Sequence, residues 1–261
     1  MLKISHISKT FNPGTVNEKK AIEDLSLELK QGDFATIIGS NGAGKSTLFN
    51  AICGDFLTDT GSIELDNKDI TFMPQHARAR SIGRLYQDPM RGTAPGMTIE
   101  ENLALAAGKG GWLSHTTRQE KERFREELKK LDIGLEERMS HPVGLLSGGQ
   151  RQALTLLMAT LKKPQLLLLD EHTAALDPKT AAKVLEATDR IVGQDNLTTL
   201  MITHNMKDAI AHGNRLVMMY EGHIIYDVAG EEKKKLHVSD LLEKFEQVSG
   251  GSFANDRMIL S

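Results

Sequence analysis

Apolar and polar positions recur with two different periods along the chain, and each period predicts its own kind of element. Leu25, Leu27 and Leu29 alternate with polar neighbours, which is typical of a strand with one buried face. Residues 2–7 follow the same alternation less strictly, so a second strand is expected there. The polar residues 12–20 between them include proline and glycine, which predicts a surface loop. We therefore expect an antiparallel β part at the N-terminus.

Beyond this part, short apolar runs alternate with segments whose apolar residues recur every three to four positions. The short runs predict strands at residues 34–38, 62–66, 81–86, 166–169, 198–203, 216–220 and 223–228. The longer period predicts helices at residues 45–53, 98–107, 116–131, 147–161 and 178–192. Strands that alternate with helices indicate an α/β fold with a mostly parallel sheet covered on both faces. A helical insertion, residues 89–161, interrupts this sheet.

Two further features each leave two interpretations open. A C-terminal helix carries an apolar stripe that either docks on its own domain or contacts a second copy of the chain; the stripe consists of Val238, Leu241, Leu242 and Phe245. Trp112 follows a glycine-rich turn in the helical insertion, where it either packs locally or touches a membrane partner.

Composition and charge exclude several classes of protein. The 261 residues carry a formal net charge of −3, which disfavours a strongly basic nucleic-acid binder. Cys53 is the only cysteine, so an intramolecular disulfide and a cysteine zinc cluster are both excluded. No run approaches the 18 or so apolar residues of a membrane span, and the start of the chain does not resemble a signal peptide. We expect a soluble, cytoplasmic chain whose membrane role, if any, depends on a partner.

The first chemical motif is the glycine-rich run Gly39–Thr47, which matches the phosphate-binding pattern G-x-x-x-x-G-K-[ST]. It follows an expected strand and opens an expected helix, which is the context that this pattern requires. Glycines let backbone N–H groups crowd around phosphate oxygens, and the helix N-terminus adds positive potential. In such loops Lys45 reaches the β- and γ-phosphates, and the Ser46 hydroxyl binds Mg²⁺.

The second motif is the apolar strand 166–169 followed by Asp170 and Glu171. A buried strand of this kind delivers two carboxylates to the carboxyl edge of the sheet, where α/β folds bind ligands. Asp170 suits Mg²⁺, and Glu171 suits a general base for the attacking water. Together with the loop 39–47, this motif indicates a P-loop nucleotide hydrolase.

A third motif, Leu146-Ser147-Gly148-Gly149-Gln150, opens another expected helix and offers a second anion-binding helix N-terminus. Within one small domain this site cannot easily reach the loop 39–47. The motif 146–150 is explained if it binds a nucleotide that is held by another copy of the chain.

With these motifs in order, the sequence resembles the ATP-binding cassette (ABC) ATPase family over nearly its whole length. Gln87 resembles the family's Q-loop glutamine, Asp177 its D-loop aspartate, and His204 its switch histidine. Phe11 is similarly placed to the aromatic residue that stacks on adenine. The resemblance implies an ATP-binding core of residues 1–88 and 162–230, a helical signature sub-domain of residues 89–161, and a C-terminal helix and tail from residue 231 to residue 261.

The resemblance also implies a head-to-tail homodimer with two ATP molecules at its interface. Catalytic roles fall on Glu171, His204 and Gln87, and magnesium-binding roles on Ser46, Gln87 and Asp170. The implied ATP contacts are Phe11, Gly39, Ser40, Asn41, Gly42, Ala43, Gly44, Lys45, Ser46, Thr47, Ser147, Gly148, Gly149, Gln150 and Asp177.

One departure from the family narrows the resemblance further. His172 follows Glu171 where most of the family has proline, and residues 170–177 resemble bacterial importer ATPases that work with lipoprotein receptors, some for tryptophan or tyrosine. The implied function is an ATPase subunit at the cytoplasmic face of the membrane that powers import through a separate permease, with the lipoprotein as an indirect partner. A soluble ABC ATPase without a permease, such as an iron–sulfur assembly ATPase, remains the alternative. A DNA-repair ATPase is excluded because the segment from Lys45 to Ser147 lacks a long coiled coil.

Overall fold

The structure is a computed structural model that describes residues 1–108 and 116–249, so Trp112 lies outside the described residues. The chain forms two compact units, which are described separately below. The sheet unit comprises residues 1–83, 165–170 and those from 196 onward, and the helical unit comprises residues 84–164 and 171–195.

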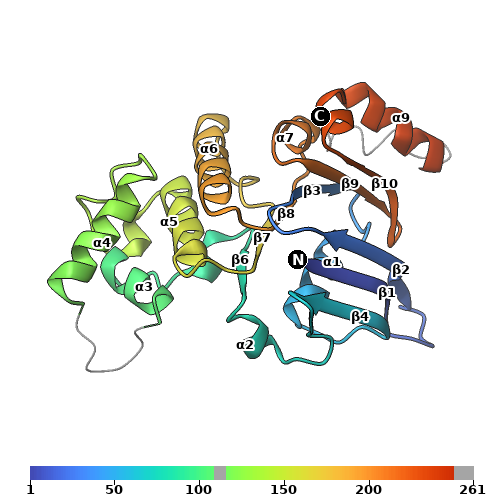
Figure 1. Cartoon of the computed structure of the whole chain (residues 1–261), viewed down its shortest axis with the longest axis horizontal. Coiled ribbons are helices and arrows are strands. Elements are labelled where there is room, and N and C mark those ends of the chain that lie inside the picture. The colour runs from blue at the N-terminus through green and yellow to red at the C-terminus, as the bar shows by residue number, and fades with distance from the viewer. Residues whose placement is uncertain (109–115, 250–261) are drawn as a thin grey trace. The chain divides into compact units, whose positions relative to one another are not determined.

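The sheet unit contains an antiparallel sheet built largely from the N-terminal part, as the alternation predicts (Figure 1). Its strand order is β2-β1-β4-β5. The bounds are Leu2–Phe11 for β1, Lys19–Leu29 for β2, Thr60–Leu65 for β4 and Lys68–Asp69 for β5. Leu25, Leu27 and Leu29 of β2 are all buried, so one face of this sheet covers the core.

The second sheet has the strand order β10-β9-β3-β8-β7-β6. The bounds are Phe34–Gly39 for β3, Ile82–Leu85 for β6, Leu166–Asp170 for β7, Thr199–Ile202 for β8, Arg215–Tyr220 for β9 and His223–Ala229 for β10. β9, β3, β8 and β7 are parallel neighbours, and β10 pairs antiparallel with β9. These two sheets confirm the expected α/β fold with a mostly parallel sheet and an antiparallel β part.

The main core of the sheet unit lies where both sheets and α1 meet. It joins Ile4 and Leu27 of the first sheet, Ile37 and Leu168 of the second, and Phe49 of α1, with an exposed fraction of 3% or less for each. The helices of this unit are α1 (Lys45–Cys53), α2 (Gln75–Arg78), α7 (Met206–Ala211), α8 (Glu231–Lys234) and α9 (Val238–Ser249).

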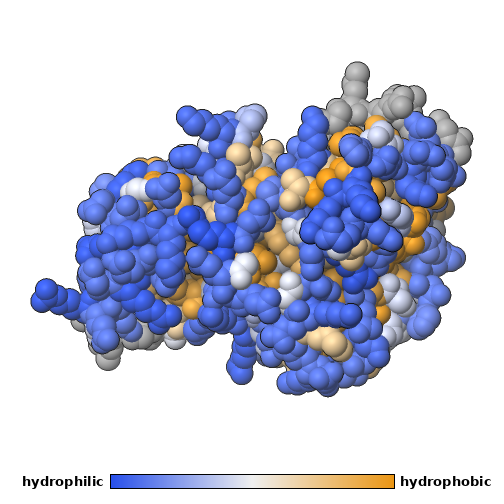
Figure 2. All heavy atoms as spheres, turned by 45° about the horizontal axis from the view of Figure 1, so that its top comes forward, coloured by the Kyte–Doolittle hydropathy of each residue, from blue (hydrophilic) through white to orange (hydrophobic). Residues whose placement is uncertain are grey.

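The apolar stripe of α9 packs on the sheet unit itself. Leu241 and Phe245 are fully buried in a cluster with Ile38, Met206 and Leu216. The stripe is therefore used for docking on its own domain. In the part of the chain that the structure describes, no helix is both long and apolar enough to cross a membrane. Hydrophilic residues cover most of the face drawn in Figure 2.

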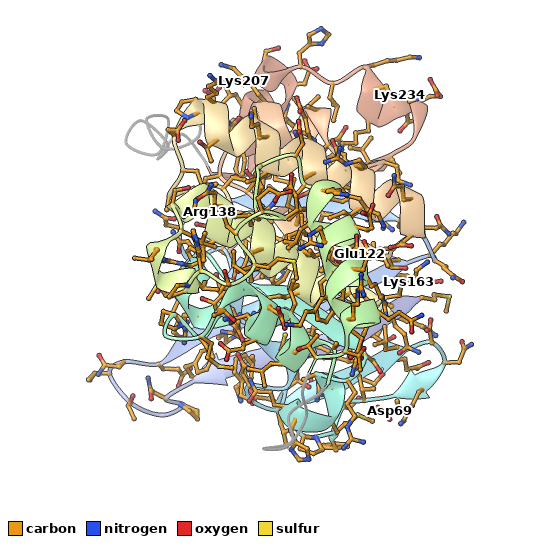
Figure 3. The ribbon with its side chains drawn as sticks, turned by 90° about the vertical axis from the view of Figure 1, so that its left-hand side faces the viewer. Asp69, Glu122, Arg138, Lys163, Lys207 and Lys234 are labelled. Carbon is orange, nitrogen blue, oxygen red and sulfur yellow. The ribbon has the colours of Figure 1, made fainter. Side chains whose placement is uncertain are left out.

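The helical unit is built from α3 (Ile99–Ala106), α4 (Arg118–Lys129), α5 (Gly148–Thr160) and α6 (Pro178–Asp195), with short 3₁₀ turns η1 (Pro89–Gly92) and η2 (Val143–Leu145). α3, α4 and α5 each begin with a capping box, which explains why they start at Thr98, Thr117 and Ser147. The polar face of α4 carries ion pairs one turn apart, such as that between Arg125 and Glu122. Figure 3 labels Glu122 on this helix.

The units differ from the expected domain boundaries in the extent of the helical part and at the C-terminal helix. The expected helical sub-domain covers residues 89–161, whereas the helical unit begins at Arg84 and also includes residues 171–195. The reason is that α6 packs against α5. The C-terminal helix, expected as a separate segment from residue 231, belongs to the sheet unit because of the α9 docking described above.

Candidate functional site

Three neighbouring strands of the second sheet end at one edge. β3, β8 and β7 are parallel, and Ile202 of β8 lies level with Ile37 of β3 and with Asp170 of β7. The carboxyl ends of these strands therefore lie at the same edge of the sheet. This edge carries the loop after Gly39, the Asp170 side chain and the segment after β8 that contains His204. Ligands of open α/β sheets bind beyond the carboxyl ends of the strands. A ligand site of the sheet unit is therefore expected at this edge.

The glycine-rich loop presents the N-terminus of α1 without a side-chain cap. Gly44 is the residue before the helix, with φ of 101°, and Gly42 also has a left-handed backbone with φ of 83°. Among the described residues no side chain caps this helix, and its first turn contains no acidic residue. The first N–H groups of α1 and the positive end of its dipole are thus suited to an anion.

Two glycines of the loop have neighbours that exclude any larger residue. A Cβ on Gly39 would lie 2.3 Å from the Met219 carbonyl oxygen, and one on Gly44 would lie 2.5 Å from that of Ala21. Both neighbours are backbone atoms of the sheet unit and cannot turn away. The close approach of loop and sheet is therefore what requires glycine at these two positions.

Lys45, the first residue of α1, folds back across the loop. Its side chain is buried, and Nζ donates hydrogen bonds to the carbonyl oxygens of Gly39 (2.7 Å) and Ser40 (3.0 Å). A positive charge is therefore held inside the concave side of the loop. The next residue, Ser46, is exposed and offers its hydroxyl on the same helical turn.

Lys19, expected in the surface loop 12–20, instead begins β2, and its ammonium group is a second cation beside the phosphate-binding loop. Lys19 pairs with Phe11 in the β1–β2 ladder, and directly opposed residues of an antiparallel pair share one face of the sheet. The Lys19 ammonium lies 3.4 Å from the position that a Cβ on Gly42 would occupy. The rings of Phe11 and Phe56 pack edge to face, with 5.3 Å between their centres. The hairpin thus brings an aromatic ring and a positive charge to this region of the sheet unit.

In the helical unit, Ser147 and Gln150 form the capping box of α5. The Ser147 hydroxyl accepts a hydrogen bond from the Gln150 N–H (3.3 Å), and the Gln150 side-chain oxygen accepts one from the Ser147 N–H (3.2 Å). A hydroxyl has two lone pairs and one proton, so Ser147 can still donate to an anion while it caps its own helix. Ser147 and Gly148 are both exposed.

Gly149 packs against the start of α6, which carries the predicted Asp177 at its N-terminus. A Cβ on Gly149 would lie only 1.9 Å from Cγ2 of Thr180. Asp177 accepts a hydrogen bond from the Thr180 N–H (3.1 Å), and hydrogen bonds from Thr180 hold the pKa of the Asp177 carboxyl below its usual range. The two predicted motifs, residues 147–150 and Asp177, are therefore neighbours within the helical unit.

Gln87 follows β6 and is exposed, and the residue before it is tied to α5. The buried Gln152 side chain donates a hydrogen bond to the Tyr86 carbonyl oxygen (3.3 Å). The guanidinium groups of Arg84 and Arg91 lie 4.7 Å and 5.2 Å from the centre of the Tyr86 ring. Gln152 could not be predicted from the sequence, because a glutamine in an amphipathic helix does not indicate which distant backbone carbonyl its side chain will contact.

The acidic pair and the histidine occupy strand ends. Asp170 ends β7, and Glu171, the next residue, has a left-handed backbone with φ of 47°. His204 follows β8, and the adjacent Asn205 caps α7 by accepting from the N–H groups of Lys207 (2.8 Å) and Asp208. Burial raises the pKa of the Asp208 carboxyl. The backbone of Asp170 is therefore fixed by the sheet, and the backbone just after His204 is fixed by the cap of α7.

The predicted site residues are divided between the units. Phe11, residues 39–47, Asp170 and His204 belong to the sheet unit, whereas Gln87, residues 147–150, Glu171 and Asp177 belong to the helical unit.

Known proteins resemble this chain over most of its length. The family model described as "ABC transporter" matches residues 22–174. A tyrosine transport ATP-binding protein of Clostridioides difficile is 46% identical over 249 residues, which cover 94% of this chain and 99% of that protein. A carnitine transport ATP-binding protein of Listeria monocytogenes is 33% identical over 94% of this chain and 59% of its own length.

Solved structures give the same result for the fold. A cassette of an ABC transporter in its ADP conformation has a TM-score of 0.79 and 28% identity, and the match covers 94% of this chain and 98% of that one. A dimeric ATP-binding cassette in a post-hydrolysis state, bound to ADP and phosphate, has a TM-score of 0.75 and 27% identity, over 88% and 98% of the two chains.

Proposed function

This chain belongs to the ABC transporter family and is an ATPase subunit of an import system, and we propose that it binds and hydrolyses ATP with the residues described above. The observation that carries the assignment is the uncapped N-terminus of α1, where the buried Lys45 ammonium lies inside a glycine loop. This arrangement is suited to the phosphates of a nucleotide, because the N–H groups and the lysine all present positive charge. Lys19 adds a second cation for the same phosphates.

We propose that Mg²⁺ accompanies the nucleotide, held by Ser46 and Asp170, with Gln87 near it. Within residues 1–108 and 116–249, no cluster of three or more histidine, cysteine or acidic side chains forms a metal site. This fits Mg²⁺, which usually takes one or two protein oxygens and completes its octahedron with phosphates and water. When bound, the ion neutralises charge on the phosphates during transfer.

The remaining roles follow from the chemistry of each side chain. Glu171 accepts a proton from the attacking water as a general base. His204 donates a hydrogen bond to the γ-phosphate and so holds the reacting groups in line. Catalysis is then mainly positioning and electrostatic stabilisation of the phosphoryl group. Phe11 stacks on the adenine, and the other residues of the loop 39–47 bind phosphate through their backbone N–H groups.

We further propose that two copies pair head to tail. In that arrangement Ser147, Gly148, Gly149, Gln150 and Asp177 of one chain contact the nucleotide that the other chain's loop holds. The exposed, capped start of α5 supports this role, since it offers a hydroxyl and N–H groups to an anion from outside the chain. A solved cassette of similar fold, a dimer bound to ADP and phosphate, supports the pairing of two copies.

The chain is proposed to work at the cytoplasmic face of the membrane, bound to a separate permease, with a substrate-binding lipoprotein as an indirect partner. The cargo is proposed to be an amino acid, and the 46% identity to a tyrosine transport ATP-binding protein supports this class. The rival assignment, an iron–sulfur assembly ATPase, would have only soluble partners.

Purification of the tagged chain from detergent-solubilised membranes tests the transporter assignment. Recovery of a multi-span membrane protein in stoichiometric amount is the expected result, and its ATPase activity should rise when the amino acid and receptor are supplied. Recovery of soluble partners alone, from the same membranes, would contradict the permease and favour the iron–sulfur alternative.

A further inference from the structure

We propose that His172 is a positioning residue that fixes the backbone of Glu171 by a buried hydrogen bond to Thr188 of α6. This inference rests on the proposed role of Glu171 as the general base. His172 occupies the position after Glu171, and its side chain is only 3% exposed. Its Nε2 atom lies 3.2 Å from the Thr188 hydroxyl oxygen, and that residue is also buried.

The direction of this hydrogen bond follows from a second one. The Thr188 hydroxyl donates its single proton to the Val184 carbonyl oxygen at 2.8 Å, one turn earlier in α6. Toward His172 the hydroxyl can therefore offer only a lone pair. Consequently the His172 Nε2 atom carries a proton and donates it to the Thr188 hydroxyl oxygen.

Glu171 needs such support because its backbone is in an unfavourable region. With φ of 47° it adopts a left-handed conformation that residues other than glycine rarely take, and that persists only where the surroundings enforce it. The Glu171 carbonyl oxygen accepts a hydrogen bond from the Ala174 N–H (3.0 Å), which closes a tight turn around His172. The His172 side chain then ties this turn to α6.

The helix that receives the hydrogen bond is itself held firmly. α6 packs along α5, and Val184 and Thr188 on its inner face are buried. The buried hydrogen bond from His172 to Thr188 therefore anchors the turn at Glu171 to a helix that is itself fixed by packing.

Two substitutions that each remove one partner of the hydrogen bond test the proposal from both ends. His172→Phe keeps an aromatic ring, larger than imidazole, but removes the N–H donor, and Thr188→Val keeps the shape but removes the acceptor. Each is expected to lower kcat for ATP hydrolysis by about 10- to 100-fold, since small misplacements of a catalytic group cost this much. The KM for ATP should change less than about twofold, because no phosphate-binding residue moves. The double variant should be no slower than the slower single variant, because both remove one interaction.

Conservative variants and a matched control separate positioning from general stability. His172→Gln retains an N–H donor at a similar reach, and Thr188→Ser retains the hydroxyl, so both should restore most of kcat. Thr160→Val serves as the control, because Thr160 of α5 is also buried and donates to the carbonyl four residues earlier (2.9 Å). That variant should lose a similar amount of thermal stability and keep its kcat.

Glu171→Gln, measured in parallel, distinguishes failure of this inference from failure of the proposed function. If Glu171→Gln is inactive while His172→Phe and Thr188→Val keep normal kcat, the positioning role is wrong and the base assignment stands. If Glu171→Gln hydrolyses ATP normally, the base assignment fails. A fall in kcat that merely follows the loss of stability, and that Thr160→Val reproduces, would also overturn the positioning role. Should His172→Phe not fold, Thr188→Val gives the same test.

Discussion

Gly149 at the start of α5 and Thr180 at the start of α6 are packed so closely that a methyl group on Gly149 would lie 1.9 Å from Cγ2 of Thr180. Threonine is branched at Cβ and turns away only with difficulty, so Gly149→Ala must push α5 and α6 apart. We expect this substitution to destabilise the chain by about 1–3 kcal/mol and to lower ATP hydrolysis more than tenfold. Thermal unfolding and steady-state ATPase assays measure the two effects.

The neighbouring glycine supplies the control for this steric explanation. A Cβ on Gly148 would meet nothing closer than Leu176 Cδ2 at 3.4 Å, which is ordinary contact, so Gly148→Ala should leave stability nearly unchanged. Thr180→Ser removes the clashing methyl group and should restore the stability that Gly149→Ala loses. Equal destabilisation by both alanine variants, or no recovery with Thr180→Ser, would contradict the steric cause.

Lys19 is expected to strengthen nucleotide binding. Replacing it with methionine removes a charge beside the loop 39–47 and keeps the length of the side chain, so the Kd for ATP should rise about three- to tenfold. The effect should shrink at high salt, because the side chain is exposed and its charge is screened. Lys20→Met is the matched control, since Lys20 pairs with Glu23 (3.4 Å). Similar affinity in both variants would show that Lys19 does not contact the phosphates.

Arg78 is expected to hold the end of the phosphate-binding helix in place. Its guanidinium is buried and donates to the carbonyl oxygens of Ala51 and Ile52, in the last turn of α1, and to those of Thr71 and Met73. Arg78→Met leaves these buried carbonyls without their donor, so the free energy of unfolding should fall by about 3 kcal/mol. Urea unfolding measures this loss of free energy, and Arg80→Met is the control because Arg80 is exposed. If both variants lose the same free energy of unfolding, the capping role of Arg78 is refuted.

The N-cap of α6 should make stability depend on pH. Hydrogen bonds from Thr180 lower the pKa of Asp177 in the folded chain, so its charged form is favoured on folding. This stabilisation is complete above the unfolded pKa of about 4 and is lost as the pH falls through the folded pKa. Asp177→Asn keeps an oxygen cap that does not titrate. The difference in urea midpoint between the unmodified chain and Asp177→Asn should therefore shrink from pH 7 to pH 3. A difference that stays constant with pH would contradict the role of the charged Asp177 carboxylate as the N-cap.

Much of the fold follows from local patterns. The helix at residues 45–53 matches α1, and the leucine run at residues 166–169 matches β7, because the glycine turn and the acidic pair mark the ends of these elements. Short elements such as α7 escaped prediction. Its six residues are too few to establish a helical period, and only the Asn205 cap marks its start.

The site could be predicted only as far as its motifs are continuous in sequence. The loop 39–47 and the residues 147–150 contain their own glycines and capping residues, so their geometry is local. Lys19, Gln152 and Thr188 act through partners that are distant in sequence, and no local pattern reveals those partners. Likewise, only the fold reveals the partner of His172, whose buried ring meets the Thr188 hydroxyl of α6.

The light-scattering mass of Glu171→Gln with ATP and Mg²⁺ tests the central assignment most directly. Without its general base this variant should bind ATP, form a dimer of twice the monomer mass, and hydrolyse at least about 100-fold more slowly than the unmodified chain. Adding Ser147→Arg should abolish the dimer and leave ATP binding to each monomer intact. Normal hydrolysis by Glu171→Gln, or a mass that stays monomeric with saturating ATP, would contradict a shared site in which Glu171 is the base.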